Sequence, residues 1–390
     1  MTRPRITDDQ RRARLVSRQL LAAEHRVNTV EAAADAMVAL HATTAWTVYL
    51  SAWARMSGFG RESMSDALCE SRTLVKQLCM RRTLFVMSRP VLADAVSATA
   101  ARVSASERTN MLRDLRRSPD FDDPEAWIDT ARAAVLAELA DGTDHTAAEL
   151  RKRLPALDGH IHYKPEKSYG GRMAMAPRVL SMMSAAGEIV RGPNEGKWYQ
   201  SRPRWAGMTQ WLGEPLALED AHAGHVAMIR RWLATFGPGT ETDIVWWLGS
   251  TKTAVRKALA DIDIVEVELD GGHLGYVLAD DADDVEAADP QAALLPELDP
   301  TTMGYKERDF YLGGHRAQLF DSNGNGGATA WWGGRIVGGW LQDDAARVRL
   351  HLLEDVSVAA RRALSERAAE LTDWLDGTQL RPGYPAPFLR

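Results

Sequence analysis

The chain has 390 residues, of which 45% are apolar and 26% charged, a composition typical of globular proteins with roughly two to four domains at this length. Its formal net charge of −6 argues at first against a nucleic-acid partner, and its two cysteines are too few for a disulfide framework or a cysteine-ligated zinc site. It has neither an apolar run of about 18 residues nor an apolar leader, so we expect a cytoplasmic protein without a membrane-spanning helix.

Two helices are predicted near the start of the chain, at about residues 6–24 and 28–40. The apolar spacing of the second helix places His41 near its apolar face. Thr43 and Thr44 precede a further helix and suit its N-cap, where free backbone N–H groups form a ready anion site. A phosphate bound there would bring its sugar close to His41. The alternative interpretation is a core histidine bonded to a carbonyl, followed by an ordinary threonine cap.

One pattern then occurs three times: a short capped helix, a turn, a second helix with apolar residues at 3.6-residue spacing, and a β-ribbon. It predicts a winged helix, whose second helix can enter a DNA groove while the ribbon touches the backbone. Such units also serve as protein scaffolds, and we favour that role for the third. The predicted second helices and strands are 73–82 and 83–87 in the first unit, 175–187, 188–191 and 197–200 in the second, and 250–260, 264–269 and 273–278 in the third.

The segments around these units are predicted to be helical first and β-rich later. Residues 90–140 are expected to be helical, with a break at the Asp/Pro-rich stretch 119–124. Beyond residue 289, glycine-rich strands and a final amphipathic helix at about 357–376 predict a small β-domain, in which dense glycine is more typical of a tightly curved barrel than of a DNA contact. The predicted domains are 1–120, 121–210, 211–288 and 289–390.

The charge is unevenly distributed along the chain, and this changes what the net value implies. Residues 1–120 hold 19 basic and 12 acidic side chains and residues 151–210 hold 11 and 4, whereas residues 211–300 hold 5 and 18. Two basic blocks can steer a polyanion, although solvated faces of mixed charge would give the same counts. The candidate DNA contacts are the basic residues in or beside the second helices of the first two units: Arg72, Lys76, Arg81, Arg82, Lys164, Lys167, Arg172 and Arg178.

Four segments, at residues 40–55, 80–84, 295–309 and 334–340, resemble the bacterial winged-helix DNA-binding family that includes the interstrand-crosslink DNA glycosylases AlkZ and YcaQ. The resemblance runs over nearly the whole chain, and the motifs keep their order. It implies an α+β fold of three tandem winged helices in a C-shape, with a small C-terminal β-barrel, around a channel for duplex DNA.

The resemblance also identifies a catalytic segment. The family has Gln-x-Gln or Gln-x-Asp where this chain has His41, Ala42 and Thr43. Hydrolysis of the N-glycosidic bond of a cationic alkylated base requires a water beneath the anomeric carbon and stabilisation of positive charge. A neutral imidazole can orient or deprotonate that water, because its pKa is normally near 6.5, and Thr43 can position it. The segment has no lysine that could form a Schiff base, so a lyase activity is not expected.

The sequence therefore predicts a monomeric, monofunctional DNA glycosylase that acts on alkylated or bulky purine adducts in double-stranded DNA. Neither a metal nor another cofactor is expected, because the two histidine pairs, His160/His162 and His222/His225, lack further ligands at zinc spacing and no glycine-rich phosphate loop follows a strand. The alternatives are a non-catalytic DNA-binding protein, which regulates or shields lesions, and a protein scaffold.

Overall fold

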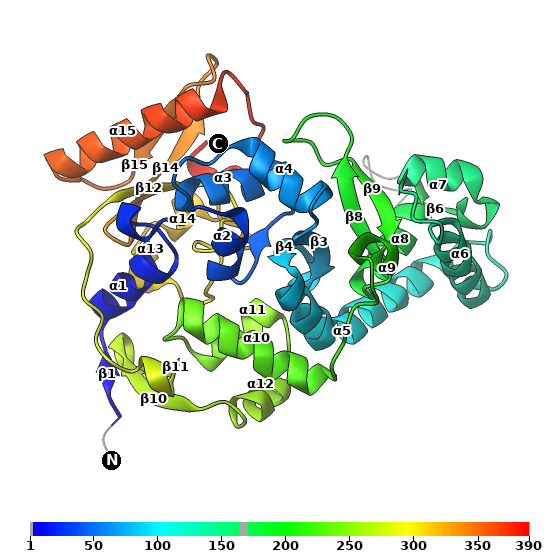
Figure 1. The fold of residues 1–390 in the computed structure, drawn as a ribbon, viewed down its shortest axis with the longest axis horizontal. Helices are drawn as coiled ribbons and strands as arrows, with labels where there is room; N and C mark the ends of the chain where they lie inside the picture. Colours follow the sequence, from blue (N-terminus) through cyan, green and yellow to red (C-terminus); the bar gives the residue numbers. More distant parts are fainter. Residues whose placement is uncertain (1–2, 164–170, 390) are drawn as a thin grey trace.

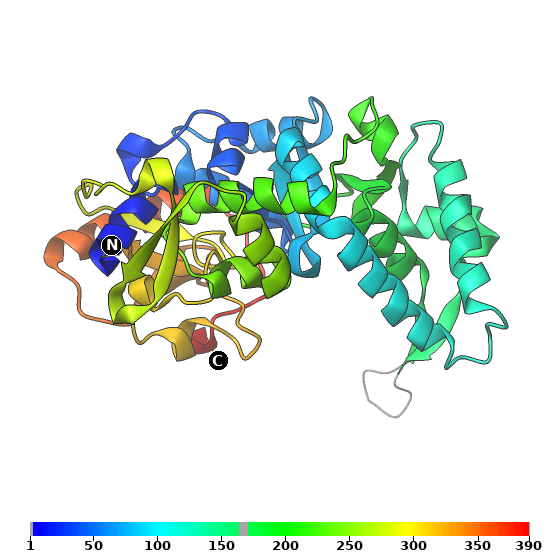
Figure 2. The ribbon, with the colours of Figure 1, turned by 90° about the horizontal axis from the view of Figure 1, so that it is seen from below.

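The computed structural model describes residues 3–163 and 171–389, so the predicted contacts Lys164 and Lys167 lie outside the described residues. The fold is mixed α+β, with a large body and a smaller projecting arm that are joined through helix α5 (Arg89–Leu115) (Figures 1 and 2). The arm has its own apolar core, the main core extends from the body into the base of the arm, and a small third cluster lies at β1, β10 and β11. No helix in the described ranges is long and apolar enough to cross a membrane.

The N-terminal segment belongs structurally with a distant part of the chain. β1 (Arg5–Ile6) pairs in parallel with β10 (Ile264–Leu269), and α1 (Asp8–Arg18) packs on helices of the third and C-terminal regions. The Thr7 side chain caps α1, whereas Leu20, at φ 59°, redirects the chain soon after the helix. The helix is therefore shorter than the predicted 6–24.

The first unit follows the order helix, short strand, helix, helix and hairpin, and the short strand pairs with the last strand. Every residue of its central helix is buried, which fixes the unit inside the body. The elements are α2 (Val30–Ala36), β2 (Leu40–His41), α3 (Ala45–Arg55), α4 (Arg61–Cys69), β3 (Leu74–Cys79) and β4 (Thr83–Ser88), in the sheet order β2-β4-β3.

The predicted second helix of this unit, at residues 73–82, is wrong. The segment is strand β3 followed by the short 3₁₀ turn η2 (Met80–Arg82), and all six residues of β3 pair with β4. Left-handed backbone at Arg72, Arg81 and Arg82, with φ between 52° and 58°, interrupts any helix at both ends. The helix that precedes the hairpin is α4 instead.

The second unit forms the arm and repeats the topology of the first, with an additional hairpin. The predicted strand at 197–200 is wrong, because that segment belongs to the turn before β9. The elements are α6 (Pro124–Glu138), β5 (His145–Thr146), α7 (Ala147–Arg153), the additional hairpin β6 (His160–Tyr163) and β7 (Gly171–Ala174), α8 (Ala176–Ala185), β8 (Ile189–Asn194), β9 (Pro203–Gly207) and α9 (Met208–Leu212), in the sheet order β5-β9-β8.

The third unit has the same order again, and its predicted helices and strands are confirmed. A single β-bridge between Gly239 and Tyr276 takes the place of the short first strand. The elements are α10 (Ala221–Phe236), α11 (Glu241–Leu248), α12 (Lys252–Leu259), β10 and β11 (Leu274–Leu278).

The C-terminal region contains an open antiparallel sheet, so the predicted β-barrel is not found in the described residues. The outer strands β12 and β15 do not pair with each other, and the terminal helix packs on the sheet instead. The elements are β12 (Ala292–Leu295), α13 (Asp309–Leu312), α14 (Arg316–Leu319), β13 (Thr329–Trp332), β14 (Arg335–Gln342), β15 (Val348–Leu352) and α15 (Val358–Leu375).

Polar contacts fasten the arm to the body. The Gln77 side-chain amide of β3 donates to the carbonyl of Ser184 in α8. The guanidinium of Arg72 lies 4.0 Å from the ring centroid of Trp211, and Arg89 donates to the Leu212 carbonyl at 3.1 Å. These contacts join side chains of β3, of the residues just before it and of α5 to backbone carbonyls and a tryptophan ring of the arm, so the junction is a packed interface.

Candidate functional site

His41 lies on strand β2 and is 4% exposed. It pairs in register with Phe85 of β4, and the two rings meet edge-to-face with centroids 5.3 Å apart. Its Nδ1 atom is buried without a hydrogen-bond partner. Burial, together with the charge of Arg81, lowers the pKa of His41 to about 3, so the ring is neutral at pH 7. The expected pKa near 6.5 and the expected helical position are both wrong.

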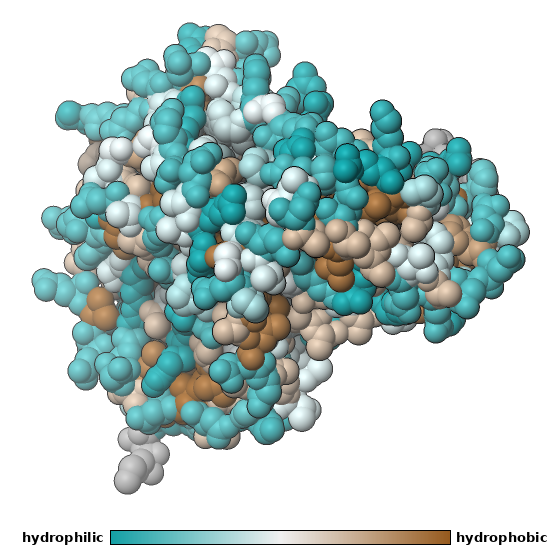
Figure 3. All heavy atoms as spheres, turned by 45° about the vertical axis from the view of Figure 1, so that its right-hand side comes forward, coloured by the Kyte–Doolittle hydropathy of each residue, from teal (hydrophilic) through white to brown (hydrophobic). Residues whose placement is uncertain are grey.

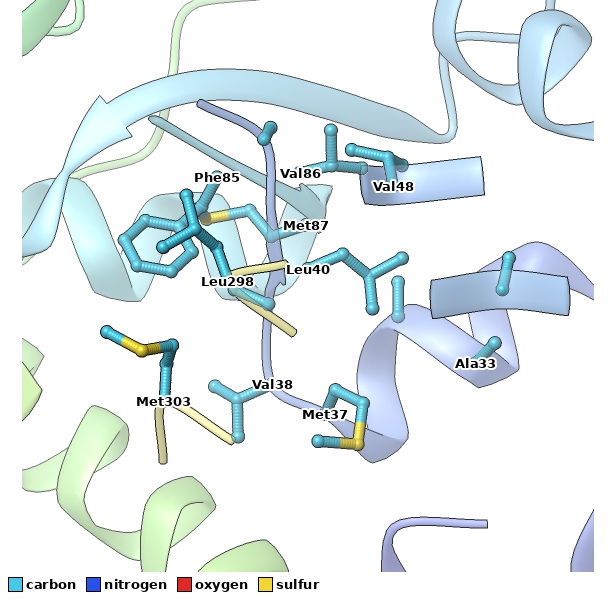
Figure 4. Packing of buried hydrophobic residues seen from close by; sticks show 14 of the residues in the cluster. Ala33, Met37, Val38, Leu40, Val48, Phe85, Val86, Met87, Leu298 and Met303 are labelled. Carbon is cyan, nitrogen blue, oxygen red and sulfur yellow. The ribbon is translucent and has the colours of Figure 1, made fainter. Parts of the chain in front are cut away.

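The position of His41 follows from the way the chain leaves α2. Val38, at φ 62°, ends the helical path, and the next residues extend into β2. Side chains alternate along a strand, so Leu40 points to one side and His41 to the side of Phe85. Figure 4 shows Leu298 beside Phe85, and both belong to the main apolar cluster together with Met303. The ring against which His41 packs is therefore itself buried by a segment from the C-terminal region.

Thr43 and Thr44 have different environments. Thr43 is exposed and lies two residues beyond the end of β2. When the antiparallel register of β2 and β4 is extended through the bond from Ala42 N–H to the Leu84 carbonyl, Thr43 lies opposite Thr83, next to η2. Thr44 is the N-cap of α3, as predicted, but its hydroxyl donates to a carboxylate oxygen of Glu297 at 2.7 Å and makes no capping bond. Burial raises the pKa of Glu297. A carboxyl group from the C-terminal region therefore already occupies the space beside this helix N-terminus.

The basic residues predicted from the first unit lie in three different surroundings. Arg72 is held against Trp211, and Lys76, half-buried on β3, has a pKa lowered to about 8 by burial and by the charge of Arg191. Both belong to the junction between body and arm. Arg82 is exposed and pairs with Glu107 of α5. Arg81 is half-buried, beside the third unit.

The basic residues predicted from the second unit lie on the arm. Arg172, on β7, is exposed, with a guanidinium nitrogen 3.3 Å from Nδ1 of His160. Arg178, on α8, donates to Asp114 of α5 at 2.7 Å. Arg178 therefore lies against the helix that joins the arm to the body.

A hollow of about 370 Å³ brings part of this set together. Arg82 from the first unit and Arg178 from the arm both line it. Arg113 on α5, which the sequence reasoning missed, is exposed at the same place. The sequence did contain a signal for Arg113, because basic residues recur in the predicted helical segment just before its break at residues 119–124. The remaining lining residues are Asn110, Asp114 and Met173.

The face of the molecule on which the arm comes forward is mostly hydrophilic. Figure 3 shows hydrophilic residues over most of this face, with small apolar patches on the body and the arm. A polar surface is typical of nucleic-acid contacts and unlike the apolar centre of a stable protein interface.

The histidine pairs do not form a metal centre in the described residues. His222 lies 2.6 Å from a carboxylate oxygen of Asp261, and His225 lies 2.7 Å from the Ser250 hydroxyl. No group of three or more His, Cys, Asp or Glu side chains is arranged to hold a metal ion within the described ranges.

Two comparisons with known proteins found a match, one to a family model and one to a solved fold. A protein-family model described as "DNA glycosylase AlkZ-like" matches residues 34–374. The solved structure of the Streptomyces sahachiroi DNA glycosylase AlkZ has a similar fold, with a TM-score of 0.74 and 20% sequence identity, over 96% of this chain and 98% of that chain. A search of curated proteins found no match.

Proposed function

Because this chain belongs to the AlkZ-like DNA glycosylase family, we propose that it is a monofunctional DNA glycosylase that hydrolyses the N-glycosidic bond of alkylated or bulky-adduct purines in duplex DNA. The observation that carries the proposal is the extent of the family match, which includes all three repeated units and the His41 segment. The shared fold supports the same conclusion at the level of architecture.

In this proposal the three repeated units are winged helices, arranged in a C-shape around the DNA. The short first strand lies beside the last strand in the first two units, and the Gly239–Tyr276 bridge reproduces that pairing in the third. DNA contacts the side on which the arm and the body both present guanidinium groups, because phosphate contacts position a protein on the duplex. The proposed contacts are Arg82, Arg113, Arg172 and Arg178.

The proposed role of His41 is to hold the attacking water with its neutral ring. A group with a pKa of about 3 is too weak a base to take a proton at neutral pH, but its unpartnered Nδ1 can accept a hydrogen bond from water. The water oxygen bonds to the anomeric carbon, and the electrons of the breaking C–N bond neutralise the cationic base as it leaves. Thr43 fixes the water or a neighbouring phosphate, and the proton passes to solvent.

A base-release assay tests the catalytic proposal. Duplex DNA with one N7-alkylguanine is incubated with wild type and with His41→Ala, and abasic sites are detected by alkaline cleavage. We expect wild type to release the base, and His41→Ala to bind the duplex with similar affinity but to release the base at least about tenfold more slowly. Equal rates for the two proteins would remove His41 from the mechanism.

One observation favours the second candidate function, a DNA-binding protein without catalysis. His41 is almost fully buried while Thr43 is exposed, so the two residues do not face one common space as a catalytic pair would. If wild type binds the damaged duplex and releases no base, this alternative replaces the first. The absence of any DNA affinity at low salt would contradict both and favour the scaffold.

A further inference from the structure

Two arginines from distant parts of the chain meet at one aromatic ring. The guanidinium carbon of Arg81, in η2, lies 4.0 Å from the ring centroid of Trp246 in α11, and that of Arg308, just before α13, lies 5.2 Å from the same ring. Gly249, at φ +60°, ends α11, and a Cβ there would lie 3.1 Å from the Arg81 backbone nitrogen. The glycine therefore allows this close approach of the first and third units.

Neither arginine has a carboxylate partner in the described parts of the chain. The Arg81 side chain makes no hydrogen bond or ion pair there, and its Nε is buried without a partner. Arg308 is 2% exposed, donates to the Thr302 carbonyl at 3.3 Å and contacts the Met303 sulfur at 3.9 Å, and its Nε also has no partner.

No carboxylate lies within ion-pairing distance of Arg308 in the described residues. The more distant charges of Asp243 and Asp309 raise the pKa of Arg308 and so partly oppose the effect of burial. Asp243 is itself engaged, since it accepts the backbone N–H groups of Lys306 and Glu307 at 2.8 Å each. Burial is the first cause that lowers the pKa of both arginines, and the charge of Arg308 is the second cause for Arg81, whose pKa falls to about 10.

Arg55, a buried arginine with a purely structural role, has far more hydrogen-bond partners than Arg81 or Arg308. It is 0% exposed, forms two bonds to the Asp299 carboxylate at 2.7 and 2.9 Å, and also donates to Thr301 and to backbone carbonyls. Arg81 has the face of Trp246 and the partial negative charge of the α11 C-terminus at Gly249. Arg308 has the Thr302 carbonyl and the rings of Trp246 and, at 4.5 Å, Phe320, so neither guanidinium has the carboxylate that Arg55 has. Two desolvated guanidinium groups with so little compensation favour the binding of an anion between them.

We propose that Arg81 and Arg308 bind one phosphate of the DNA backbone, with Trp246 as the wall of the site. This inference rests on the proposed function, because it takes the phosphate from the substrate. Guanidinium groups match phosphate oxygens geometrically. Trp246 and Arg81 are half-buried whereas Arg308 is 2% exposed, so in this proposal the phosphate approaches from the side of Trp246 and Arg81. A phosphodiester held there offsets two positive charges, of which that of Arg81 acts on His41. Arg81 and Arg308 are therefore positioning residues.

The first test uses inorganic phosphate and no DNA, so it judges the site independently of the proposed function. The melting temperature of the full chain is measured against phosphate concentration for wild type, Arg81→Gln and Arg362→Gln. Arg362 is the control, because it is an exposed arginine of α15 that pairs with Glu366 and is not among the proposed DNA contacts. We expect a saturable rise in wild type and Arg362→Gln, and none in Arg81→Gln. An equal rise in all three proteins, or none in wild type, would overturn the site.

The second test identifies the phosphate in DNA. Single methylphosphonate groups, which lack the charge, are placed in turn along a duplex, and affinity is measured for each. We expect wild type to lose about tenfold at one position, and Arg81→Gln to lose nothing further at that position while it stays sensitive at others. Equal sensitivity of the two proteins at every position would contradict the proposal. Neither test measures base release, so a catalytically inactive protein would still give a clear answer.

Arg308→Lys provides a second variant in case Arg81→Gln folds poorly. The lysine keeps the positive charge at this buried position but lacks the planar set of N–H donors with which a guanidinium group binds phosphate oxygens. We expect its phosphate-induced rise in melting temperature to fall well below that of wild type, with an unchanged melting temperature in the absence of phosphate. A full phosphate response in Arg308→Lys would exclude Arg308 from the site.

Discussion

At the scale of single residues, the environment of His41 determines what the residue can do. The sequence identified the position through its place in the family motif, but the residue type alone suggested a group that titrates near neutral pH. Burial against Phe85 and the nearby charge of Arg81 change that property. The chemistry that remains to a neutral imidazole is the acceptance or donation of hydrogen bonds.

The lowered pKa of His41 should make the protein less stable in acid. In the unfolded chain the pKa is about 6.5, so below that pH the unfolded state binds a proton that the folded state does not bind until about pH 3. The free energy of unfolding linked to neutral His41 is fully retained above pH 6.5 and decreases as the pH falls from 6.5 towards 3. Relative to His41→Gln, wild type should lose about 1.4 kcal/mol of unfolding free energy for each pH unit below 6.5. Urea denaturation at pH 7 and pH 5 measures the difference, with His351→Gln, at an exposed histidine, as the control.

The same shift predicts the pH dependence of the reaction. Because the ring stays neutral from about pH 5 to pH 8, the single-turnover rate of base release should be flat over that range. Rates on the N7-alkylguanine duplex at half-unit intervals provide the measurement. A fall in rate with a midpoint near 6.5 would show that His41 acts as a titrating base.

At the scale of elements, sequence patterns predicted the third unit well and the first unit poorly. Helices α11 and α12 have clear caps and charged exposed faces, so local signals were sufficient. In segment 73–82, apolar residues fit a helix as well as a strand, and strand β4 decides the outcome by pairing with all six residues of β3. Arg81 and Arg308 were not linked from the sequence, because they meet only when α11 packs on η2.

Two capping boxes offer a matched comparison at this scale. The box of α7 (Thr146 and Glu149) is on the surface, whereas that of α11 (Thr240 and Asp243) is buried and also holds the backbone that leads to Arg308. Replacement of Asp243 by Ala should cost about 3 kcal/mol of unfolding free energy, because it leaves the backbone N–H groups of Thr240, Lys306 and Glu307 without their acceptor. Thr146→Ala should cost about 1 kcal/mol.

Chemical denaturation of both variants measures these two costs. Asp243→Ala should also weaken the response of the melting temperature to inorganic phosphate, and Thr146→Ala should not. Similar losses of stability in the two variants would show that the buried box does no more than cap its helix.

At the scale of the whole molecule, charge is organised by surface and not by domain. The net charge of −6 averages the acidic stretch 211–300 with guanidinium groups that body and arm present together. The two basic blocks of the sequence predicted such an uneven distribution. It did not identify Arg113, whose neighbours in the hollow come from other units and are brought to it by the fold.

Removal of these groups should change the salt dependence of DNA binding. In a variant with Arg82, Arg113 and Arg172 all replaced by Gln, the slope of log affinity against log salt concentration should fall in magnitude by about 0.9 for each lost phosphate contact. Fluorescence anisotropy between about 50 and 200 mM salt measures the slope. Arg362→Gln, on the exposed face of α15 and away from the arm in Figure 1, should leave it unchanged. An unchanged slope in the triple variant would place the DNA elsewhere.

The packed junction between body and arm determines which partner must adapt on binding. Gln77, Arg72 and Arg89 reach across it to arm backbone or side chains, so the two halves of the proposed DNA surface are held at a set separation. A duplex that follows such a surface bears most of the deformation itself, and the energy required depends on how stiff its base stacking is. A bulky or charged adduct that weakens stacking lowers that energy. Discrimination between damaged and intact DNA can therefore begin in the mechanics of the duplex, before any side chain touches the altered base.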